Sequence, residues 1–139
     1  MNNLYLDTNF FLYLSEFSSP FYQECFQLIK YCKVNKITLV TSTETIQEII
    51  HFTKNTKQLE KGLQTAQKTL ELVNEILPIN QITIEIYLKK AAIYKTSSSR
   101  DLIHLAVCLE NKIKNLITFD KDFEKFKELE ILQPKNITT

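Results

Sequence analysis

Acidic side chains stand at positions of this sequence where they could act together. Asp7 directly follows the apolar run Leu4–Leu6 and precedes a second apolar stretch. Burying such a carboxylate without a partner is costly, so Asp7 requires a cation or hydrogen-bond donors. Glu48, Asp101 and Asp120 lie at predicted element boundaries or near predicted helix starts. We therefore treat Asp7, Glu48, Asp101 and Asp120 as the candidate site.

Divalent metal ions would give these four carboxylates a common role. Carboxylates gathered in one pocket repel each other, and some stay protonated unless a cation is present. Mg²⁺ and Mn²⁺ prefer oxygen ligands and need only a few carboxylates plus water. Two such ions activate a water molecule and stabilise the leaving oxygen of a phosphodiester. The pattern therefore predicts a metal-dependent hydrolase of phosphodiester bonds.

Taken singly, most of these acids also fit structural positions. Asp101 would be a favourable charge in the first turn of a helix. Asp120 would be the N-cap of a short helix. Glu48 would be a solvated helix position, as Glu44 one turn earlier would be, and Glu44 stays an alternative to Glu48 in the site. Asp7 is the hardest to explain without a functional role, so the set is more informative than any member.

The elements that must position these acids follow from the apolar pattern, in which short runs alternate with longer helical spacings. Strands are predicted at Leu4–Leu6, Ile37–Val40 and Leu116–Phe119, with a short apolar pair at Ile131–Leu132. Pro78 either ends the long helix before it or starts a short third strand, Ile76–Asn80. Helices are predicted at Phe10–Glu16, from the cap Ser19 and Pro20 through Cys32, from Thr41–Thr43 through Ile50, over Leu59–Leu77, from about Thr83, and from the cap Ser97–Ser99 through Leu109.

Strands that alternate with helices predict an α/β fold. We expect a central, mostly parallel sheet of four to five strands with helices on both faces. Ligands of such folds bind outside the carboxyl ends of the strands. Asp7 and Asp120 each close a predicted strand at that edge, which brings the candidate acids toward one place.

Length and composition narrow the function further. The 139 residues predict a single domain over 1–139. One glycine in the chain excludes the GxGxxG and P-loop phosphate sites. A net charge of +1 argues against non-specific coating of nucleic acid. The start, MNNLYLDTNF, lacks the basic segment of a signal peptide, and no apolar run approaches the roughly 20 residues of a membrane span. We expect a cytoplasmic protein with no membrane contact.

Cysteine and histidine offer little for a metal site. Cys25, Cys32 and Cys108 are expected to be buried thiols, because three cysteines without a signal peptide do not indicate a disulfide framework. With His51 and His104 as the only histidines and no CxxC motif, a structural zinc site is not expected. His104 is expected to be a packed helix histidine, and a role in orienting a carboxylate is the alternative.

Four segments, in this order, resemble the PIN domain family, and specifically the small VapC-type toxins of toxin–antitoxin systems. The segments are LDTN at 6–9, TSTETIQEII at 41–50, SSSRDLIHLAVC at 97–108 and LITFDKDF at 116–123. The resemblance spans nearly the whole chain. It implies a three-layer PIN-like fold and a ribonuclease dependent on Mg²⁺ or Mn²⁺, in which water held by metal attacks the phosphodiester.

The resemblance also assigns residues. It implies an acidic quartet of Asp7, Glu48, Asp101 and Asp120 that is catalytic and binds metal, with Asp122 as an additional metal-binding acid. It implies supporting positions at Thr8, Asn9 and Thr118. Arg100, the only arginine, contacts RNA phosphate or pairs with an acid, and a solvated surface position is the alternative.

The resemblance implies partners as well: an RNA substrate, a cognate antitoxin and a second copy of the chain in a homodimer. The helix predicted over 57–77 and the N-terminal helices are candidates for these contacts. The family commonly has more glycine before Asp101 and before the fourth strand. Here those segments contain TSSS and ENKIKN, so we expect Asn111 or Asn115 to supply the left-handed turn.

Two other functions fit parts of the pattern. A PIN-like module that binds RNA or protein without cutting would be indicated by loss of a quartet member, but all four acids are present. A phospho-accepting signalling domain also uses aspartates at strand ends with Mg²⁺. It would normally have two adjacent acids near the N-terminus, where this chain has Asn2 and Asn3 ahead of the single Asp7.

Overall fold

The computed structural model describes residues 2–139, and Met1, where the predicted domain begins, lies outside the described residues. The elements follow one another as β1 (Asn3–Leu6), α1 (Thr8–Leu14), α2 (Tyr22–Asn35), β2 (Thr38–Ser42), α3 (Thr43–Asn55), α4 (Leu59–Leu72), β3 (Glu75–Leu77), α5 (Gln81–Ile93), α6 (Ser99–Glu110), β4 (Asn115–Ile117), the 3₁₀ helix η1 (Lys121–Lys125), β5 (Glu130–Leu132) and α7 (Pro134–Thr138).

The five strands form one sheet in the order β3-β2-β1-β4-β5, and every neighbouring pair is parallel. The predicted parallel sheet is therefore confirmed. Strand order runs outward from β1 in both directions, so the chain reverses its direction of winding between β1 and β4. In open parallel sheets a ligand crevice forms at such a reversal, beyond the carboxyl ends of the strands.

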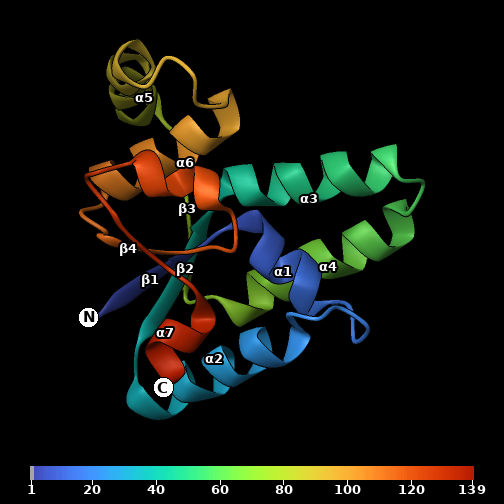
Figure 1. Ribbon diagram of the computed structural model, residues 1–139. Coiled ribbons are helices and arrows are strands. Elements are labelled where there is room, and N and C mark those ends of the chain that lie inside the picture. The colour runs from blue at the N-terminus through green and yellow to red at the C-terminus, as the bar shows by residue number, and fades with distance from the viewer. Residues whose placement is uncertain (1) are drawn as a thin grey trace.

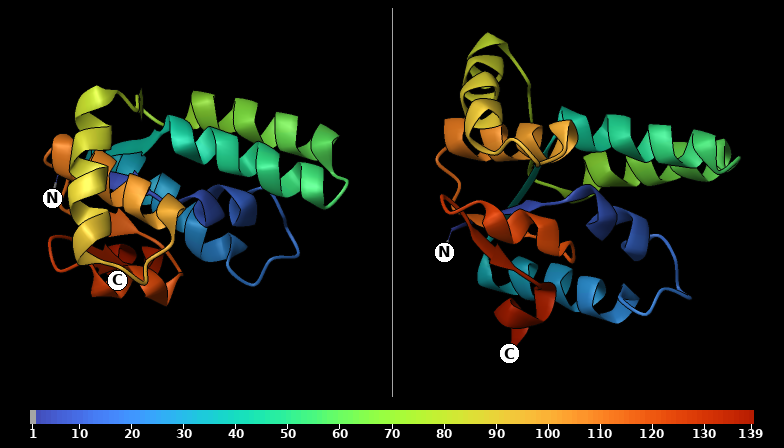
Figure 2. Two further views of the ribbon diagram at one scale, coloured as in Figure 1. Left: turned by 90° about the horizontal axis from the view of Figure 1, so that it is seen from above. Right: turned by 45° about the horizontal axis from the view of Figure 1, so that its top comes forward.

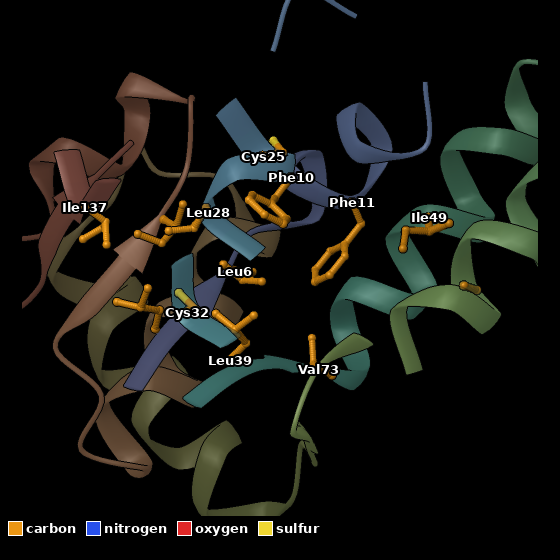
Figure 3. Close-up of a cluster of buried hydrophobic side chains, with 13 residues drawn as sticks. Leu6, Phe10, Phe11, Cys25, Leu28, Cys32, Leu39, Ile49, Val73 and Ile137 are labelled. Atoms are coloured by element: carbon orange, nitrogen blue, oxygen red, sulfur yellow. The ribbon is translucent and has the colours of Figure 1, made fainter. Parts of the chain in front are cut away.

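Helices cover both faces of the sheet, as the alternation of side chains along the strands requires. Leu4 and Leu6 of β1 point into one core, which α1, α2 and α7 cover, whereas Tyr5 points into the other core, beneath α6 and η1. Figure 3 shows the first core, where Leu6 and Leu39 of neighbouring strands meet the side chains of α1 and α2. The three-layer fold is thus confirmed.

Helices α3 and α4 form an antiparallel pair that extends to one side of the sheet (Figures 1 and 2). Gly62, the only glycine in the chain, lies on α4 in close contact with α3. A Cβ atom at this position would collide with the side chain of Thr53 on α3. Glycine is needed here for that close approach, and the φ angle of Gly62 is not positive.

The helix predicted over Leu59–Leu77 was too long. Helix α4 ends at Leu72, and the backbone of Val73 is already extended. Asn74 then pairs with the sheet edge: its backbone N–H donates to Leu39 O at 2.8 Å, and its side-chain oxygen accepts from Leu39 N at 2.8 Å. These bonds draw the chain into β3, so Leu77 belongs to a strand rather than to the helix.

The predicted bounds of several other elements were also wrong by a few residues. Ser19 does not cap α2 directly, because a turn in which its Oγ accepts from Phe21 N precedes the helix. The third strand ends at Leu77, because Pro78 brings no N–H to the ladder. The first helix begins at Thr8 rather than Phe10, because Asp7 is its N-cap.

The turn before β4 also differs from the prediction. Lys112 takes the left-handed conformation there, with φ 57°, in place of Asn111 or Asn115. Ile113 N donates to Cys108 O at 2.9 Å across this turn, which closes the end of α6. Among residues 2–139, no helix combines the length and the apolar content that a membrane crossing demands.

Candidate active site and metal centre

Asp7 lies at the reversal point of the sheet, between the ends of β1 and β4. Its backbone N–H extends the ladder to Ile117 O at 3.1 Å. Its Oδ1 accepts a hydrogen bond from Thr8 N at 2.7 Å, which makes Asp7 the N-cap of α1. Its Oδ2 accepts from the Thr118 hydroxyl at 2.8 Å. Both carboxylate oxygens are therefore fixed, and the side chain is 5% exposed.

Burial raises the pKa of Asp7 above its usual value, and the charge of Glu48 adds to this effect. The charge of His104 and the two hydrogen bonds from Thr118 and Thr8 oppose it. The residues around Asp7 thus supply donors and a positive charge that favour the carboxylate, although the buried position disfavours it.

Three further aspartates gather beside this point. One carboxylate oxygen from each of Asp101, Asp120 and Asp122 lies within 4.8 Å of the other two. Asp101 comes from the first turn of α6, where its N–H donates to Ser98 Oγ at 3.1 Å. Asp120 caps η1, and its Oδ1 accepts from Asp122 N at 2.9 Å.

Thr118 joins the two groups of acids. Its hydroxyl donates to Asp7 Oδ2 and also accepts from Asp120 N at 3.0 Å. Strand β4 ends at Ile117, before the predicted end at Phe119, so Thr118 and Phe119 form the turn that brings Asp120 back toward Asp7. The sequence prediction of Thr118 as a supporting residue is consistent with these two contacts.

Among residues 2–139, none of the three aspartates of this cluster forms a salt bridge. Burial, the charge of Asp120 and the charge of Asp7 raise the pKa of Asp101 to about 6. Hard carboxylate oxygens in close proximity are what Mg²⁺ and Mn²⁺ bind, together with water. The residues present therefore fit a divalent cation held by Asp101, Asp120 and Asp122, with Asp7 adjacent.

Glu48 has a different partner. His104 Nε2 donates to Glu48 Oε1 at 2.5 Å and lies 4.0 Å from Asp7 Oδ1. On the other side of the ring, His104 Nδ1 lies 2.5 Å from the Tyr5 hydroxyl, which is 2.7 Å from Ser42 Oγ. His104 is 1% exposed, and a continuous chain of polar groups runs from β2 through β1 and α6 to the half-buried Glu48 on α3.

The charges in this chain support each other. Burial alone would lower the pKa of His104, but the Glu48 hydrogen bond and the charge of Asp7 raise it above its ordinary value. Burial alone would raise the pKa of Glu48, but the hydrogen bond to His104 and its charge lower it. The raised pKa of His104 favours its protonated form beside Glu48. His104 is both a packed histidine and one that orients a carboxylate.

The remaining predicted residues divide between the site and its surroundings. Thr8 is buried. Burial raises the pKa of Glu48, and the side chain of Thr8 adds a smaller lowering effect to that of His104. Arg100 is exposed beside Asp101. Asn9 instead lines a separate cavity of about 440 Å³ between α1 and α4.

The sequence left the choice between Glu44 and Glu48 open. Burial and the charge of Glu48 raise the pKa of Glu44, whereas Glu48 alone of the two is hydrogen-bonded to His104. Tyr5 was missed entirely as a site-supporting residue. Its signal was a hydroxyl-bearing side chain at the centre of an otherwise apolar strand.

Comparison with known proteins agrees with this geometry. The model of the PIN domain family matches residues 4–129. The VapC ribonuclease Mb1869c of Mycobacterium bovis is 30% identical over 87% of this chain and 92% of its own length. The crystal structure of VapBC2 from Rickettsia felis bound to a promoter DNA fragment covers 94% of this chain and 98% of its own, with TM-score 0.78 and 16% identity.

A toxin–antitoxin complex from Klebsiella pneumoniae also covers 94% of this chain and 97% of its own, with TM-score 0.65 and 24% identity. The matched residues run from β1 to the segment after η1, so they include all four aspartates. The chain therefore belongs to the PIN domain family and is related to the VapC ribonucleases.

Proposed function

We propose that this chain is a ribonuclease dependent on Mg²⁺ or Mn²⁺ that hydrolyses RNA phosphodiesters as the toxin of a toxin–antitoxin pair. The observation that carries this proposal is the gathering of every aspartate of the chain, Asp7, Asp101, Asp120 and Asp122, at the reversal point of the sheet. A module that only binds RNA or protein would not need four aspartates there.

Each residue has a distinct role in the proposed reaction. Asp101, Asp120 and Asp122 hold the cation. Asp7 adds a fourth carboxylate, which the hydrogen bond from Thr118 keeps in place. A bound divalent cation supplies a Lewis acid that polarises the phosphate and acidifies a water molecule. His104 neutralises the charge of Glu48 and keeps that carboxylate directed toward Asp7. The remaining uncompensated charge is then concentrated on the three aspartates that bind the cation.

The proposal includes a single nuclease domain over 1–139, a cytoplasmic location and two protein partners. The Klebsiella pneumoniae neighbour is a toxin–antitoxin complex, which supports an antitoxin partner for this chain. Exposed apolar side chains on and near α3 and α4, such as Phe52 and Leu63, suit the antitoxin, and those on α5, Ile82 and Leu88, suit a second copy. Light scattering that shows only monomer at high concentration would contradict the homodimer.

The test is cleavage of a panel of structured RNAs with Mg²⁺ or Mn²⁺ by the wild type, Asp7→Asn and Glu60→Gln. Glu60 is exposed on α4, so its variant controls for the loss of one carboxylate. We expect cutting by the wild type and Glu60→Gln, loss of cutting in Asp7→Asn, and loss with EDTA. Full activity of a folded Asp7→Asn protein would overturn the assigned role of the site.

A further inference from the structure

A cavity of about 230 Å³ opens beside Asp120, at the carboxyl ends of the neighbouring strands β4 and β5. Phe119, Asp120 and Lys121, from the turn after β4, form one part of its wall. Gln133 and Asn136, at the start of α7, form another. Because Asp120 belongs both to this cavity and to the three-aspartate cluster, a ligand in the cavity lies next to the proposed cation site.

The two amide side chains of the cavity are held in fixed orientations. Asn136 Oδ1 accepts a hydrogen bond from Gln133 N at 2.7 Å, and the Gln133 side chain accepts from Asn136 N in return. Each amide oxygen is therefore used in capping α7. The two NH₂ groups remain as donors for a ligand.

An aromatic ring and a carboxylate complete the lining. The ring of Phe119 is fixed by Phe21 and Tyr13, with ring centroids 4.4 Å and 5.4 Å away. Phe119 is therefore a rigid part of the wall, and its ring already packs against these two aromatic side chains. Glu124 of η1 also lines the cavity and, as a carboxylate, offers only acceptors.

We propose that this cavity binds one base of the RNA substrate and that guanine fits it best. Guanine presents two adjacent donors, N1–H and N2–H₂, for the Glu124 carboxylate, and an O6 acceptor for an amide NH₂. The cavity has the space of roughly eight water molecules, which suits one planar base. The proposal rests on the proposed ribonuclease function and adds a site that selects the nucleotide next to the cleaved bond.

The first test measures binding without catalysis. Metal-free, ¹⁵N-labelled protein is titrated with guanosine, adenosine, cytidine and uridine monophosphates, and backbone amide signals are followed by NMR. We expect guanosine monophosphate to shift the signals of 119–121 and 133–136 at the lowest concentration. Equal shifts with all four nucleotides, or shifts confined to other segments, would overturn the proposal.

Two variants with opposite changes of charge separate base recognition from electrostatics. Asn136→Asp keeps the oxygen that caps α7 but replaces the NH₂ donor, and Glu124→Gln replaces the carboxylate acceptor. We expect each variant to weaken binding of guanosine monophosphate at least about fivefold. Gln67→Glu, at an exposed position of α4, is the control for added charge. Opposite effects of Asn136→Asp and Glu124→Gln would show a charge effect alone and refute base recognition.

The second test is cleavage of a random-sequence RNA library with Mg²⁺ or Mn²⁺. We expect the wild type to cut next to guanosine and Asn136→Asp to cut with a flattened base preference. A wild type that cuts RNA with the same preference as Asn136→Asp would overturn the cavity proposal alone. A wild type that binds guanosine monophosphate in the cavity but cuts no RNA would overturn the ribonuclease proposal alone.

Discussion

The acidic site has two regions that handle negative charge in opposite ways. Around Glu48, the protein supplies its own cation, because His104 pairs with the carboxylate and is itself held by Tyr5. Around Asp101, Asp120 and Asp122, the support is weaker: Asp122 N donates to Asp120 Oδ1, and the charge of His104 and the Ser98 side chain only partly offset the raised pKa of Asp101. The first region has its partner in the folded chain, and in the proposed function the second receives its partner as a cation from solution. The difference gives the two parts of the predicted acidic set different roles in the proposed function, with Glu48 held by His104 and the three aspartates free to bind a cation.

The largest expected effect, on the cleavage rate, comes from removing a carboxylate of the three-aspartate cluster. Asp101→Asn should lower the cleavage rate by about 10³-fold, because a cation positioned beside the transition state is lost. Cleavage of an RNA substrate with Mg²⁺ measures this effect, and circular dichroism checks that the variant is folded. If Asp101→Asn cut RNA at the wild-type rate, the two regions would not differ as described.

The next effect comes from removing the internal cation beside Glu48. His104→Ala leaves Glu48 and Asp7 without their shared positive partner in a buried place, so the free energy of unfolding should fall by about 3 kcal/mol. Urea denaturation measures this change. His51→Ala, on the exposed surface of α3, is the matched control and should have little effect. Equal effects of the two variants would remove His104 from the charge balance.

Lower pH should weaken cation binding by Asp101, Asp120 and Asp122. Because the pKa of Asp101 is raised to about 6, this carboxyl is ionised at pH 7.5 and mostly protonated at pH 5. Protons then compete with the cation, so Mn²⁺ affinity should fall roughly tenfold per pH unit below about 6. Calorimetric titration between pH 5 and 7.5 measures the fall. A constant affinity over that range would contradict a role for Asp101 as a ligand.

A smaller effect concerns the stability of the metal-free protein. The folded-state pKa of Asp101 lies above the usual 3.8, so its ionisation destabilises the fold as pH rises from about 4 to about 6. Below pH 4 the carboxyl is protonated in both folded and unfolded chains, and the effect vanishes. Metal-free Asp101→Asn should therefore equal the wild type at pH 4. At pH 7 it should exceed the wild type's stability by about 1 kcal/mol, because solvent screening of this half-buried group reduces the full effect of about 3 kcal/mol. Thermal unfolding at both pH values tests this, and a variant less stable at pH 7 would refute it.

The smallest effect concerns the far end of the buried chain. Tyr5→Phe removes the hydroxyl between His104 and Ser42 while keeping the ring in the core. The free energy of unfolding should fall by about 1 kcal/mol, as for one buried hydrogen bond. Urea denaturation of Tyr5→Phe beside Tyr31→Phe, whose hydroxyl is on the surface side of α2, measures it. A loss as large as that of His104→Ala would mean that Tyr5 carries the ion pair.

The sequence predicted the parts of the site that depend on local chemistry and strand direction. Asp7 and Asp120 could be placed at one edge because parallel strands end together. The contact between Tyr5 and His104 could not be predicted, because these residues are 99 positions apart and meet only when α6 packs on β1. The end of α4 could not be predicted either. Helical spacing of apolar residues continues to Leu77, whereas Asn74 forms its hydrogen bonds with Leu39, on a strand far away in sequence.

The turn at Lys112 is a second, smaller case in which local preference did not predict the structure. Asparagine favours the left-handed region more than lysine does, so the sequence pointed to Asn111 or Asn115. The position of that turn is instead set by the bond from Ile113 N to Cys108 O, which closes α6 regardless of the residue that bears the positive φ. Tertiary contacts therefore decided what local preference could not.

The distribution of aspartates gives this protein an intrinsic spectroscopic reporter. Its four aspartates all lie at the site, whereas its twelve glutamates are spread over the chain. Protein grown with ¹³C only in aspartate carboxyl groups would give four side-chain resonances, each from the candidate site. Proton uptake, cation loading and nucleotide arrival could then be followed atom by atom, without introducing any foreign label.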